Sequence, residues 1–314
     1  MNFYLGVDGG QSSTTALIGD ETGRVAGAGC GGPCNHVGAH EGRAKFVHAI
    51  EGCVSAARAA AGLGGVRFQF ACLGFSGGPA DKESILREIL PAEQMLVTHD
   101  ALIALTGATA GEPGVIVIAG TGSIAFGRNA AGKTARAGGW GFVYGDEGGG
   151  FDLARQALRA ALRFEEGWGA PTSLREKLVA ATGARDANDL LHRFYTTEFP
   201  RPRIAALSKL VDEAAGEGDA LALDILNGAA QQLASLTGAV RAQLFQPPEI
   251  ARVAPIGGVF QSARLAERFR LLIELEDANR FGPPVYGPAA GALLEAYRAA
   301  GLSCALTNVP EMEK

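Results

Sequence analysis

The chain has 314 residues, of which 47% are hydrophobic and 19% are charged. This balance excludes a disordered protein, and the length favours two domains of ordinary size. The net charge of −5 at pH 7 argues against a nucleic-acid partner, which would favour a basic face.

No segment is suited to enter a membrane. The longest uncharged stretch, residues 113–127, is short and rich in glycine, and the N-terminal residues lack the basic segment of a signal peptide. We therefore expect a cytoplasmic protein with no membrane partner. The five cysteines are an odd number, which suits reduced thiols. Cys30, Cys34 and His36 are spaced like metal ligands, but no second group completes a zinc site.

Glycine is the unusual residue and occupies 45 of the 314 positions. The glycines fall in clusters without a fixed period, which excludes a collagen-like repeat. Because clustered glycines leave backbone N–H groups accessible, they suit the binding of anions such as phosphate.

The first third of the chain alternates strands and helices, which indicates an α/β sheet. Apolar runs and turn residues predict strands at 3–8, 14–19, 24–29, 68–74 and 94–98, and helices at 41–62 and 80–90. The pattern then begins again, with predicted strands at 115–119, 124–128 and 133–137. Both sets run strand, Gly/Ser loop, strand, turn ending in glycine, strand. This order predicts an internal repeat that places one glycine loop on each side of a nucleotide, and two unrelated hairpins are the alternative.

The rest of the chain is mainly helical. Helical spacing predicts helices at 149–163, 173–181, 186–194, 203–216, 219–245, one ending near 270, and 287–300, with strands at 250–256 and 271–275. We place the domains at 1–111 and 112–286, the second with a helical insertion. Residues 287–314 are expected to form a C-terminal helix that packs back on the first domain.

Two loops carry the pattern of a phosphate site. Asp8-Gly9-Gly10-Gln11-Ser12-Ser13 joins the first two strands, and its N–H and hydroxyl groups can hold phosphate oxygens while Asp8 holds Mg²⁺ through water. Gly120-Thr121-Gly122-Ser123 has the same chemistry. A hairpin bend without a ligand explains each loop alone equally well, and the repeat that relates them favours phosphate binding.

A third glycine segment is a misleading match. Residues 127–134 fit the P-loop pattern GxxxxGK[ST] at every position. A P-loop requires a helix that begins at its lysine, and the glycines at 138, 139 and 141 cannot continue a helix from Lys133. We therefore interpret this match as a hairpin turn.

Polar residues follow several of the predicted strands. Asp100 opens a helix after the strand 94–98, so it is either a helix N-cap or a carboxylate of an active site at the end of a strand. Asn35 and Ser76-Gly77 lie in loops that can bind a polar ligand. The segments 138–141 and 145–148 combine Trp140 with acidic residues, which suits a sugar, although each segment is also explicable as a turn.

In chain order these segments resemble the N-acetylglucosamine kinase and BadF/BadG-type ATPase family of the actin and hexokinase fold superfamily. The matching motifs are Gly-Val-Asp-Gly-Gly at 6–10, Asn-His at 35–36, Ser-Gly-Gly at 76–78, His-Asp-Ala at 99–101, Ala-Gly-Thr-Gly-Ser at 119–123, Gly-Gly-Trp-Gly at 138–141, Gly-Asp-Glu-Gly at 145–148 and Ile-Gly-Gly at 256–258. The resemblance implies an α/β fold of two ribonuclease-H-like domains with an interdomain ATP cleft and a C-terminal domain enriched in helices.

The resemblance also implies roles for single residues. Asp100 is expected to be the catalytic base, and Asp8 to hold Mg²⁺. The residues expected to contact the sugar are Asn35, Ser76, Gly77, Gly139, Trp140 and Asp146. Those expected to contact ATP are Gly9, Gly10, Gln11, Ser12, Thr121, Gly122, Gly257 and Gly258. The chain departs from the family at Gln11-Ser12-Ser13, where Gly-Thr and a basic residue are common, and at Phe142, where sugar kinases often carry histidine.

We therefore expect an enzyme that transfers the γ-phosphate of ATP to an amino sugar, N-acetylglucosamine or glucosamine, at the 6-hydroxyl. A homodimer is compatible with the resemblance. Two alternatives stay open. One is an ATPase that activates a CoA-ester reductase or dehydratase, which would carry an iron–sulfur cluster between subunits. The other is a sugar sensor without catalytic activity.

Overall fold

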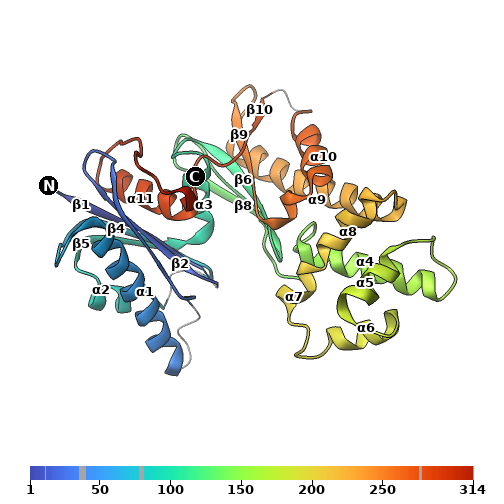
Figure 1. Ribbon diagram of the computed structural model, residues 1–314. Coiled ribbons are helices and arrows are strands. Elements are labelled where there is room, and N and C mark those ends of the chain that lie inside the picture. The colour runs from blue at the N-terminus through green and yellow to red at the C-terminus, as the bar shows by residue number, and fades with distance from the viewer. Residues whose placement is uncertain (11, 35–39, 78–80, 276–277, 314) are drawn as a thin grey trace. The chain divides into compact units, whose positions relative to one another are not determined.

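The structure is a computed structural model that describes residues 1–10, 12–34, 40–77, 81–275 and 278–313. It divides into two compact units, Met1–Pro113 together with Pro283–Lys314, and Gly114–Gly282 (Figure 1). The last long helix, α11 (Pro288–Ala299), thus belongs to the same unit as the N-terminus. Among the described residues, none of the helices combines the length and apolar character needed to cross a membrane.

The first unit is built on a five-stranded sheet in the order β3-β2-β1-β4-β5. Its strands are β1 (Phe3–Gly9), β2 (Thr14–Asp20), β3 (Val25–Gly31), β4 (Phe68–Phe75) and β5 (Ala92–His99). The pairs β1–β2 and β2–β3 are antiparallel, whereas β4 runs parallel to both β1 and β5. The predicted strands of this region are therefore confirmed, and β4 and β5 end at the same edge as β1.

Helices cover both faces of this sheet. Leu5 and Val7 of β1 point into a core formed with α1 (His40–Ala61) and α2 (Glu83–Ile89). Tyr4 and Leu17 point the other way, into a core formed with α11 and with Ile103 of α3 (Asp100–Ala108). The alternation follows from the two-residue period of a strand, which sends successive side chains to opposite faces.

Many of the glycines serve this packing and not anion binding. A Cβ on Gly29 of β3 would collide with the carbonyl oxygen of Cys53 in α1, and one on Gly6 of β1 would collide with the backbone of Leu293 in α11. These glycines let helix backbones lie directly on the sheet. The interpretation of the glycine clusters as anion sites is therefore too broad, and it applies only to the loops.

The second unit repeats the same sheet, in the order β10-β9-β6-β7-β8. Its strands are β6 (Gly114–Ala119), β7 (Ser123–Arg128), β8 (Thr134–Gly138), β9 (Ala251–Ile256) and β10 (Asn279–Phe281). The pairs β6–β7 and β7–β8 are antiparallel, and β9 is parallel to both β6 and β10. The internal repeat is confirmed, and it extends from the hairpin to all five strands.

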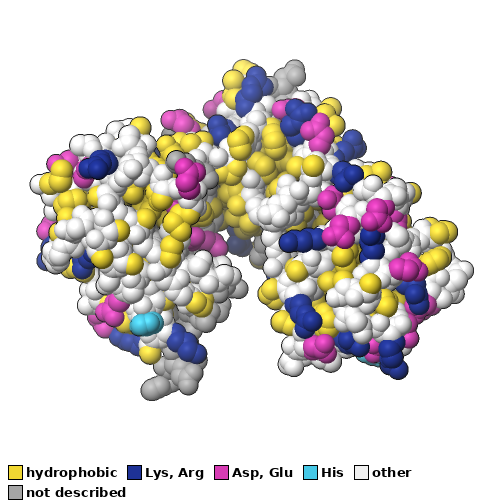
Figure 2. All heavy atoms as spheres, viewed as in Figure 1, with side chains coloured by type: hydrophobic (Ala, Val, Ile, Leu, Met, Phe, Trp, Pro, Cys, Tyr) yellow, Lys and Arg dark blue, Asp and Glu magenta, His cyan; other side chains and the backbone are white. Residues whose placement is uncertain are grey.

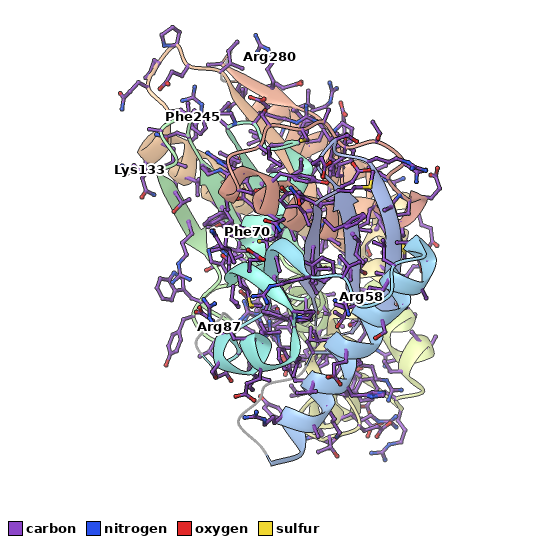
Figure 3. The ribbon with its side chains drawn as sticks, turned by 90° about the vertical axis from the view of Figure 1, so that its left-hand side faces the viewer. Arg58, Phe70, Arg87, Lys133, Phe245 and Arg280 are labelled. Atoms are coloured by element: carbon purple, nitrogen blue, oxygen red, sulfur yellow. The ribbon has the colours of Figure 1, made fainter. Side chains whose placement is uncertain are left out.

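The P-loop match lies at the turn between β7 and β8. Asn129 Nδ2 donates to the Leu244 carbonyl at 3.1 Å and Lys133 Nζ to the Gln243 carbonyl at 3.2 Å, so the turn is fastened to the end of α9 (Ala220–Leu244). Figure 3 labels Lys133 and Phe245, the residue after this helix. Because no helix begins at Lys133, the interpretation as a turn is confirmed.

The remaining helices of this unit are α4 (Gly150–Glu165), α5 (Leu174–Thr182), α6 (Ala187–Phe194), α7 (Arg201–Ala206), α8 (Ser208–Gly216) and α10 (Ala263–Ile273). Side chains of both charges are mixed over the helical part in Figure 2, with ion pairs such as Arg175–Glu165 and Arg193–Asp189.

Two predictions of elements are wrong. The single helix expected at 203–216 is two helices, α7 and α8, which meet at Leu207. The strand expected at 271–275 is instead the end of α10, because Ile273 continues the buried face begun by Leu265 and Phe269; the edge strand comes later, at 279–281.

Candidate functional site

In the first unit, Asp100 stands at the junction of β5 and α3 and contacts Ser76. Ser76 Oγ donates to Asp100 Oδ2 at 2.9 Å, and Asp100 Oδ1 accepts from the Ala101 amide at 2.8 Å. The N-cap of α3 is His99, whose Nδ1 accepts from the Leu102 amide at 3.2 Å. The capping role that could have explained Asp100 is therefore filled by its neighbour, and the Asp100 carboxylate is oriented by a second loop.

The carboxylate of Asp8 lies at the end of β1 among other acids. Burial, and then the charges of Glu313 and Asp100, raise the pKa of Asp8 to about 7. Glu313 is buried, and its carboxylate accepts from the Ala290 amide at 3.0 Å, in the first turn of α11. Sequence reasoning missed Glu313, because nothing near it in the sequence signals that the C-terminal segment returns to the end of β1.

The acidic charges near Asp8 favour a cation beside it. Carboxylate oxygens are the ligands that Mg²⁺ prefers, and a divalent cation would relieve the repulsion between Asp8 and its acidic neighbours. Asp8 stays a predicted contact of Mg²⁺, and among the described residues no three His, Cys, Asp or Glu side chains are grouped so that they could hold a metal ion together.

Backbone hydrogen bonds hold the first glycine loop in place. The Gly10 amide donates to the Ser13 carbonyl at 2.9 Å, and the Gly10 carbonyl accepts from the Cys34 amide at 2.9 Å. Gly9 has no room for a Cβ because the Phe75 ring covers it. Ser12 is exposed and accessible to a ligand. Gln11 and Asn35, both expected at the site, lie outside the described residues, whereas Gly77 follows Ser76 in a left-handed turn with φ 81°.

In the second unit, the loop 120–123 lies against the start of α4. The Gly150 amide donates to the Gly120 carbonyl at 2.8 Å and the Phe151 amide to the Thr121 carbonyl at 3.0 Å. Gly122 cannot carry a side chain, since a Cβ there would collide with the Asp146 carboxylate. The loop and Asp146 are therefore in direct contact, which brings two separately expected site segments together.

The segment 139–149 folds back on itself and presents Trp140 and Asp146. The Gly145 amide donates to the Gly141 carbonyl at 2.8 Å, and Gly139 and Gly141 have φ values of 72° and 81°. Trp140 is 66% exposed, and the guanidinium carbon of Arg136 lies 4.9 Å from the centroid of its ring. An exposed indole held in this way offers a flat apolar surface to a sugar ring.

Asp146 is held under strain and paired with a residue that sequence reasoning missed. It is 5% exposed and adopts φ 62°, a conformation uncommon outside glycine. Arg201 Nη2 lies 2.9 Å from Asp146 Oδ2, and the Arg201 guanidinium carbon lies 5.2 Å from the centroid of the Phe142 ring. Arg201 begins α7, far along the chain, and no local pattern marks it as part of the site.

Gly257 and Gly258 follow β9, beside a hollow of about 250 Å³. Gly257 has φ 108°, and a Cβ on it would collide with the Ala119 carbonyl. Among the residues that line the hollow are Gly258, Val259, Ser262, Ser208, Lys209 and Asp212. Gly257 thus lets this turn pack on Ala119, and Gly258 lines a hollow at the end of a parallel strand, which is a usual place for a nucleotide in α/β folds.

Comparison with known proteins decides the family. The BadF/BadG/BcrA/BcrD ATPase family matches residues 5–296. The chain belongs to this family. An N-acetylmuramic acid/N-acetylglucosamine kinase of Clostridium acetobutylicum is 31% identical over 281 residues, which cover 88% of this chain and 91% of that protein. An N-acetyl-D-glucosamine kinase of Dictyostelium discoideum is 33% identical over 177 residues, which cover 54% of this chain and 56% of that protein.

A solved structure shows the same family fold along nearly the whole chain. The crystal structure of a protein designated an N-acetylglucosamine kinase, from Chromobacterium violaceum, matches with a TM-score of 0.73 and 26% identity. The match covers 94% of this chain and 98% of the other. The α/β architecture with two five-stranded mixed sheets thus matches that of a solved structure along nearly the whole chain.

Proposed function

We propose that this family member is an ATP-dependent amino-sugar kinase. The observation that carries the proposal is the Asp100 carboxylate, which is held by Ser76 Oγ at 2.9 Å and by the Ala101 amide, at the edge where three parallel strands end. Sugar kinases among its relatives support the same reaction. The match to the Clostridium acetobutylicum N-acetylmuramic acid/N-acetylglucosamine kinase covers 91% of that protein.

Asp100 is assigned as the general base. It accepts the proton of the sugar hydroxyl, in our proposal the 6-hydroxyl, as that oxygen attacks the γ-phosphorus of ATP. Phosphoryl transfer depends mainly on alignment and on neutralisation of charge, so the base acts late in the reaction. Ser76 fixes the carboxylate in the orientation that faces the hydroxyl.

The phosphates of ATP are assigned to both glycine loops, through Gly9, Gly10, Ser12, Thr121 and Gly122. When bound, Mg²⁺ at Asp8 would supply the positive charge that neutralises the phosphates. The repeat of the fold supports this assignment, because it places an equivalent loop after the first strand of each sheet. The hollow beside Gly258 is assigned to the adenosine.

The sugar is assigned to Ser76 and Asp100 in one unit and to Gly139, Trp140 and Asp146 in the other. The exposed indole of Trp140 suits the apolar face of a sugar, and the Asp146 carboxylate suits its hydroxyls. Closure of the two domains over the substrates would exclude water and limit hydrolysis of ATP.

The cysteines support a kinase over a redox activator. Cys34, Cys53 and Cys72 are buried in the cores of the first unit, and the two accessible cysteines lie apart, Cys30 near the end of β3 and Cys304 beside the turn that precedes this strand.

An ADP-release assay over N-acetylglucosamine, glucosamine, N-acetylmuramate, N-acetylmannosamine and glucose tests the proposal. We expect sugar-dependent ADP release with at least one amino sugar. The same slow ADP release with and without every sugar would contradict a kinase and favour an ATPase.

A further inference from the structure

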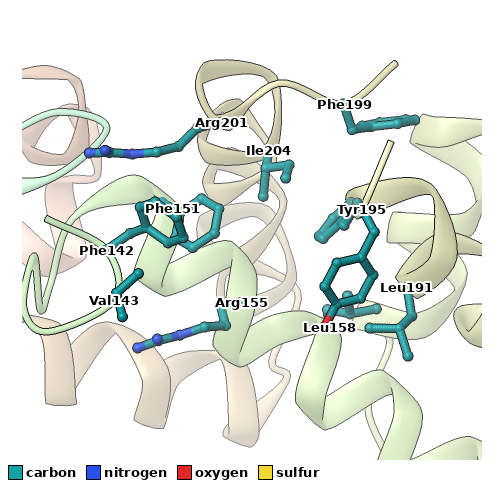
Figure 4. A pocket seen from close by; sticks show the side chains of 11 residues that line it. Phe142, Val143, Phe151, Arg155, Leu158, Leu191, Tyr195, Phe199, Arg201 and Ile204 are labelled. Carbon is teal, nitrogen blue, oxygen red and sulfur yellow. The ribbon is translucent and has the colours of Figure 1, made fainter. Parts of the chain in front are cut away.

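The second unit contains a large pocket that none of the assigned roles uses. It has a volume of about 700 Å³, which is within the range of small-molecule sites. Aromatic and aliphatic side chains from α4, α6, α7 and the segment 142–143 line it, among them Phe151, Leu158, Phe194, Phe199 and Ile204 (Figure 4). The pocket lies within one unit, so its shape is set by the packing of that unit alone.

The pocket adjoins the segment assigned to the sugar. Phe142 and Val143 line it, and they stand between Trp140 and Asp146 in the folded loop. Phe142 packs edge-on against Phe151 at a centroid distance of 5.1 Å. Arg201 lines the pocket and also pairs with Asp146 at 2.9 Å. Phe142 therefore forms one wall of this pocket and belongs to the same folded loop as Trp140 and Asp146.

The two basic residues of the lining are incompletely bonded. Arg155 and Arg201 each place a terminal nitrogen on a carboxylate, of Asp152 at 2.6 Å and of Asp146 at 2.9 Å. The Nε atom of each is nevertheless buried and has no hydrogen-bond acceptor among the described residues. The rest of each side chain is accessible, since Arg155 is 42% and Arg201 39% exposed, so the terminal nitrogens can donate further hydrogen bonds to a ligand oxygen in the pocket.

Charge and apolar surface are separated within the pocket. Figure 4 shows the guanidinium groups of Arg155 and Arg201 at the end formed by Phe142 and Val143, while Tyr195 and Leu191 lie at the opposite end. The pocket therefore suits a ligand that offers acceptor oxygens, such as those of a carboxylate, at the guanidinium end and an apolar part against the aromatic rings.

We propose that this pocket binds a carboxylate-bearing ether substituent of the amino-sugar substrate, and so selects sugars of the muramic-acid type. This inference rests on the proposed function. N-acetylmuramate is N-acetylglucosamine with a lactyl ether on O3, which adds one carboxylate and one methyl-bearing stem. The carboxylate accepts hydrogen bonds from the Arg155 guanidinium, and the stem packs on Phe142 and Phe151. An unsubstituted sugar leaves this apolar wall in contact with water.

The test compares the two sugars in a coupled ADP-release assay with the full chain. Arg155→Gln removes the charge, and Arg155→Lys keeps the charge but loses the planar fork. Arg159→Gln is the matched control, because Arg159 is exposed on the same helix and does not line this pocket.

We expect the ratio of kcat/KM for N-acetylmuramate to that for N-acetylglucosamine to fall at least about tenfold in Arg155→Gln, through KM, with a smaller fall in Arg155→Lys. In Arg159→Gln the ratio should match the wild type. An equal loss on both sugars, an unaltered ratio in Arg155→Gln, or turnover of N-acetylglucosamine without turnover of N-acetylmuramate would overturn the pocket assignment and leave the kinase assignment intact.

Calorimetric titration with N-acetylmuramate distinguishes a failure of the pocket assignment from a failure of the proposed kinase function. If the protein phosphorylates none of the five sugars of the assay panel, the proposed function fails, but N-acetylmuramate binding that weakens in Arg155→Gln supports the pocket. If neither turnover nor binding of N-acetylmuramate is found, the pocket assignment is overturned as well.

Discussion

Ser76 Oγ donates a hydrogen bond of 2.9 Å to Asp100 Oδ2, and this contact joins the ends of two neighbouring parallel strands. Ser76 follows β4 and Asp100 follows β5, so the register of the sheet brings the two side chains together. The Ser76 hydroxyl donates to one oxygen of the Asp100 carboxylate, and the Ala101 amide donates to the other. The carboxylate is therefore oriented before any substrate arrives.

Replacing Asp100 tests its role as the base. Asp100→Asn should lower kcat by about 10²- to 10⁴-fold while ATP binding persists, because the amide cannot accept the hydroxyl proton. Ser76→Ala should have a smaller effect, since it disturbs only the orientation of the carboxylate. Steady-state rates and calorimetric ATP titration check both variants. A near-normal kcat in Asp100→Asn would exclude Asp100 as the base.

The ion pair of Arg201 with Asp146 predicts an effect on the sugar alone. Arg201→Gln leaves a buried carboxylate without its partner, so we expect KM for the sugar to rise about tenfold or more and thermal stability to fall. KM for ATP should stay close to the wild-type value. Arg185→Gln, which breaks a surface pair at an 83% exposed arginine, is the control and should change neither. An equal rise of both KM values would argue against a sugar-specific role.

A substitution of Lys133 distinguishes the hairpin-turn interpretation of residues 127–134 from a true P-loop. Its ammonium is bound to the Gln243 carbonyl at 3.2 Å at the end of α9, and it belongs to no glycine loop assigned to phosphate. Lys133→Met should therefore keep kcat and KM for ATP within about twofold, whereas a P-loop lysine reaches the β- and γ-phosphates directly. Initial-rate kinetics decide between these results. A loss of activity by orders of magnitude would restore the P-loop interpretation.

Two helical glycines predict opposite changes in stability. A Cβ on Gly291 of α11 would collide with the Ile103 carbonyl oxygen and lie 2.5 Å from the Gly107 amide nitrogen. Gly291→Ala should therefore lower the free energy of unfolding by about 1–3 kcal/mol or more. Gly238 of α9 is exposed and has open space around it, so Gly238→Ala should raise that free energy by about 0.5–1 kcal/mol. Urea unfolding of both variants gives the comparison, and equal effects would contradict the packing described.

Asp219 predicts a loss of stability in acid. Burial alone would raise the pKa of this carboxyl, but hydrogen bonds from Ala222, Thr172 and Ser173 outweigh it and hold the pKa below 3.8. A lowered folded-state pKa stabilises the protein above the unfolded pKa, and this contribution disappears as the pH falls through the folded value.

The matched variants are Asp219→Asn, which keeps the N-cap of α9 and loses the charge, and Asp224→Asn, at an exposed aspartate of the same helix. The stability difference between wild type and Asp219→Asn should be constant near neutral pH and shrink below about pH 4. Unfolding in urea across this range measures it. A difference that is independent of pH would show that the Asp219 charge contributes nothing.

The strands, the helices and the internal repeat were predictable because each depends on a local period. Apolar runs bounded by turn residues marked β1 and β7, and the two glycine loops stood in the same frame between their strands. The same reasoning rejected the P-loop match, since it needed only the residues that follow Lys133. The strand expected at 271–275 was wrong because a short apolar run fits a strand and the end of a buried helix equally well.

By itself, the sequence determined the two repeated sheets, the loops that end their first strands, and the candidates Asp100, Ser76 and Asp146. Only the tertiary structure decided which side chains meet. The pairing of Arg201 with Asp146, the return of Glu313 to Asp8, the orientation of Asp100 by Ser76, and the pocket beside Phe142 all join residues distant in the chain. The physical reason is that periodicity reports the direction of a side chain along its own element, whereas these contacts depend on how separate elements pack.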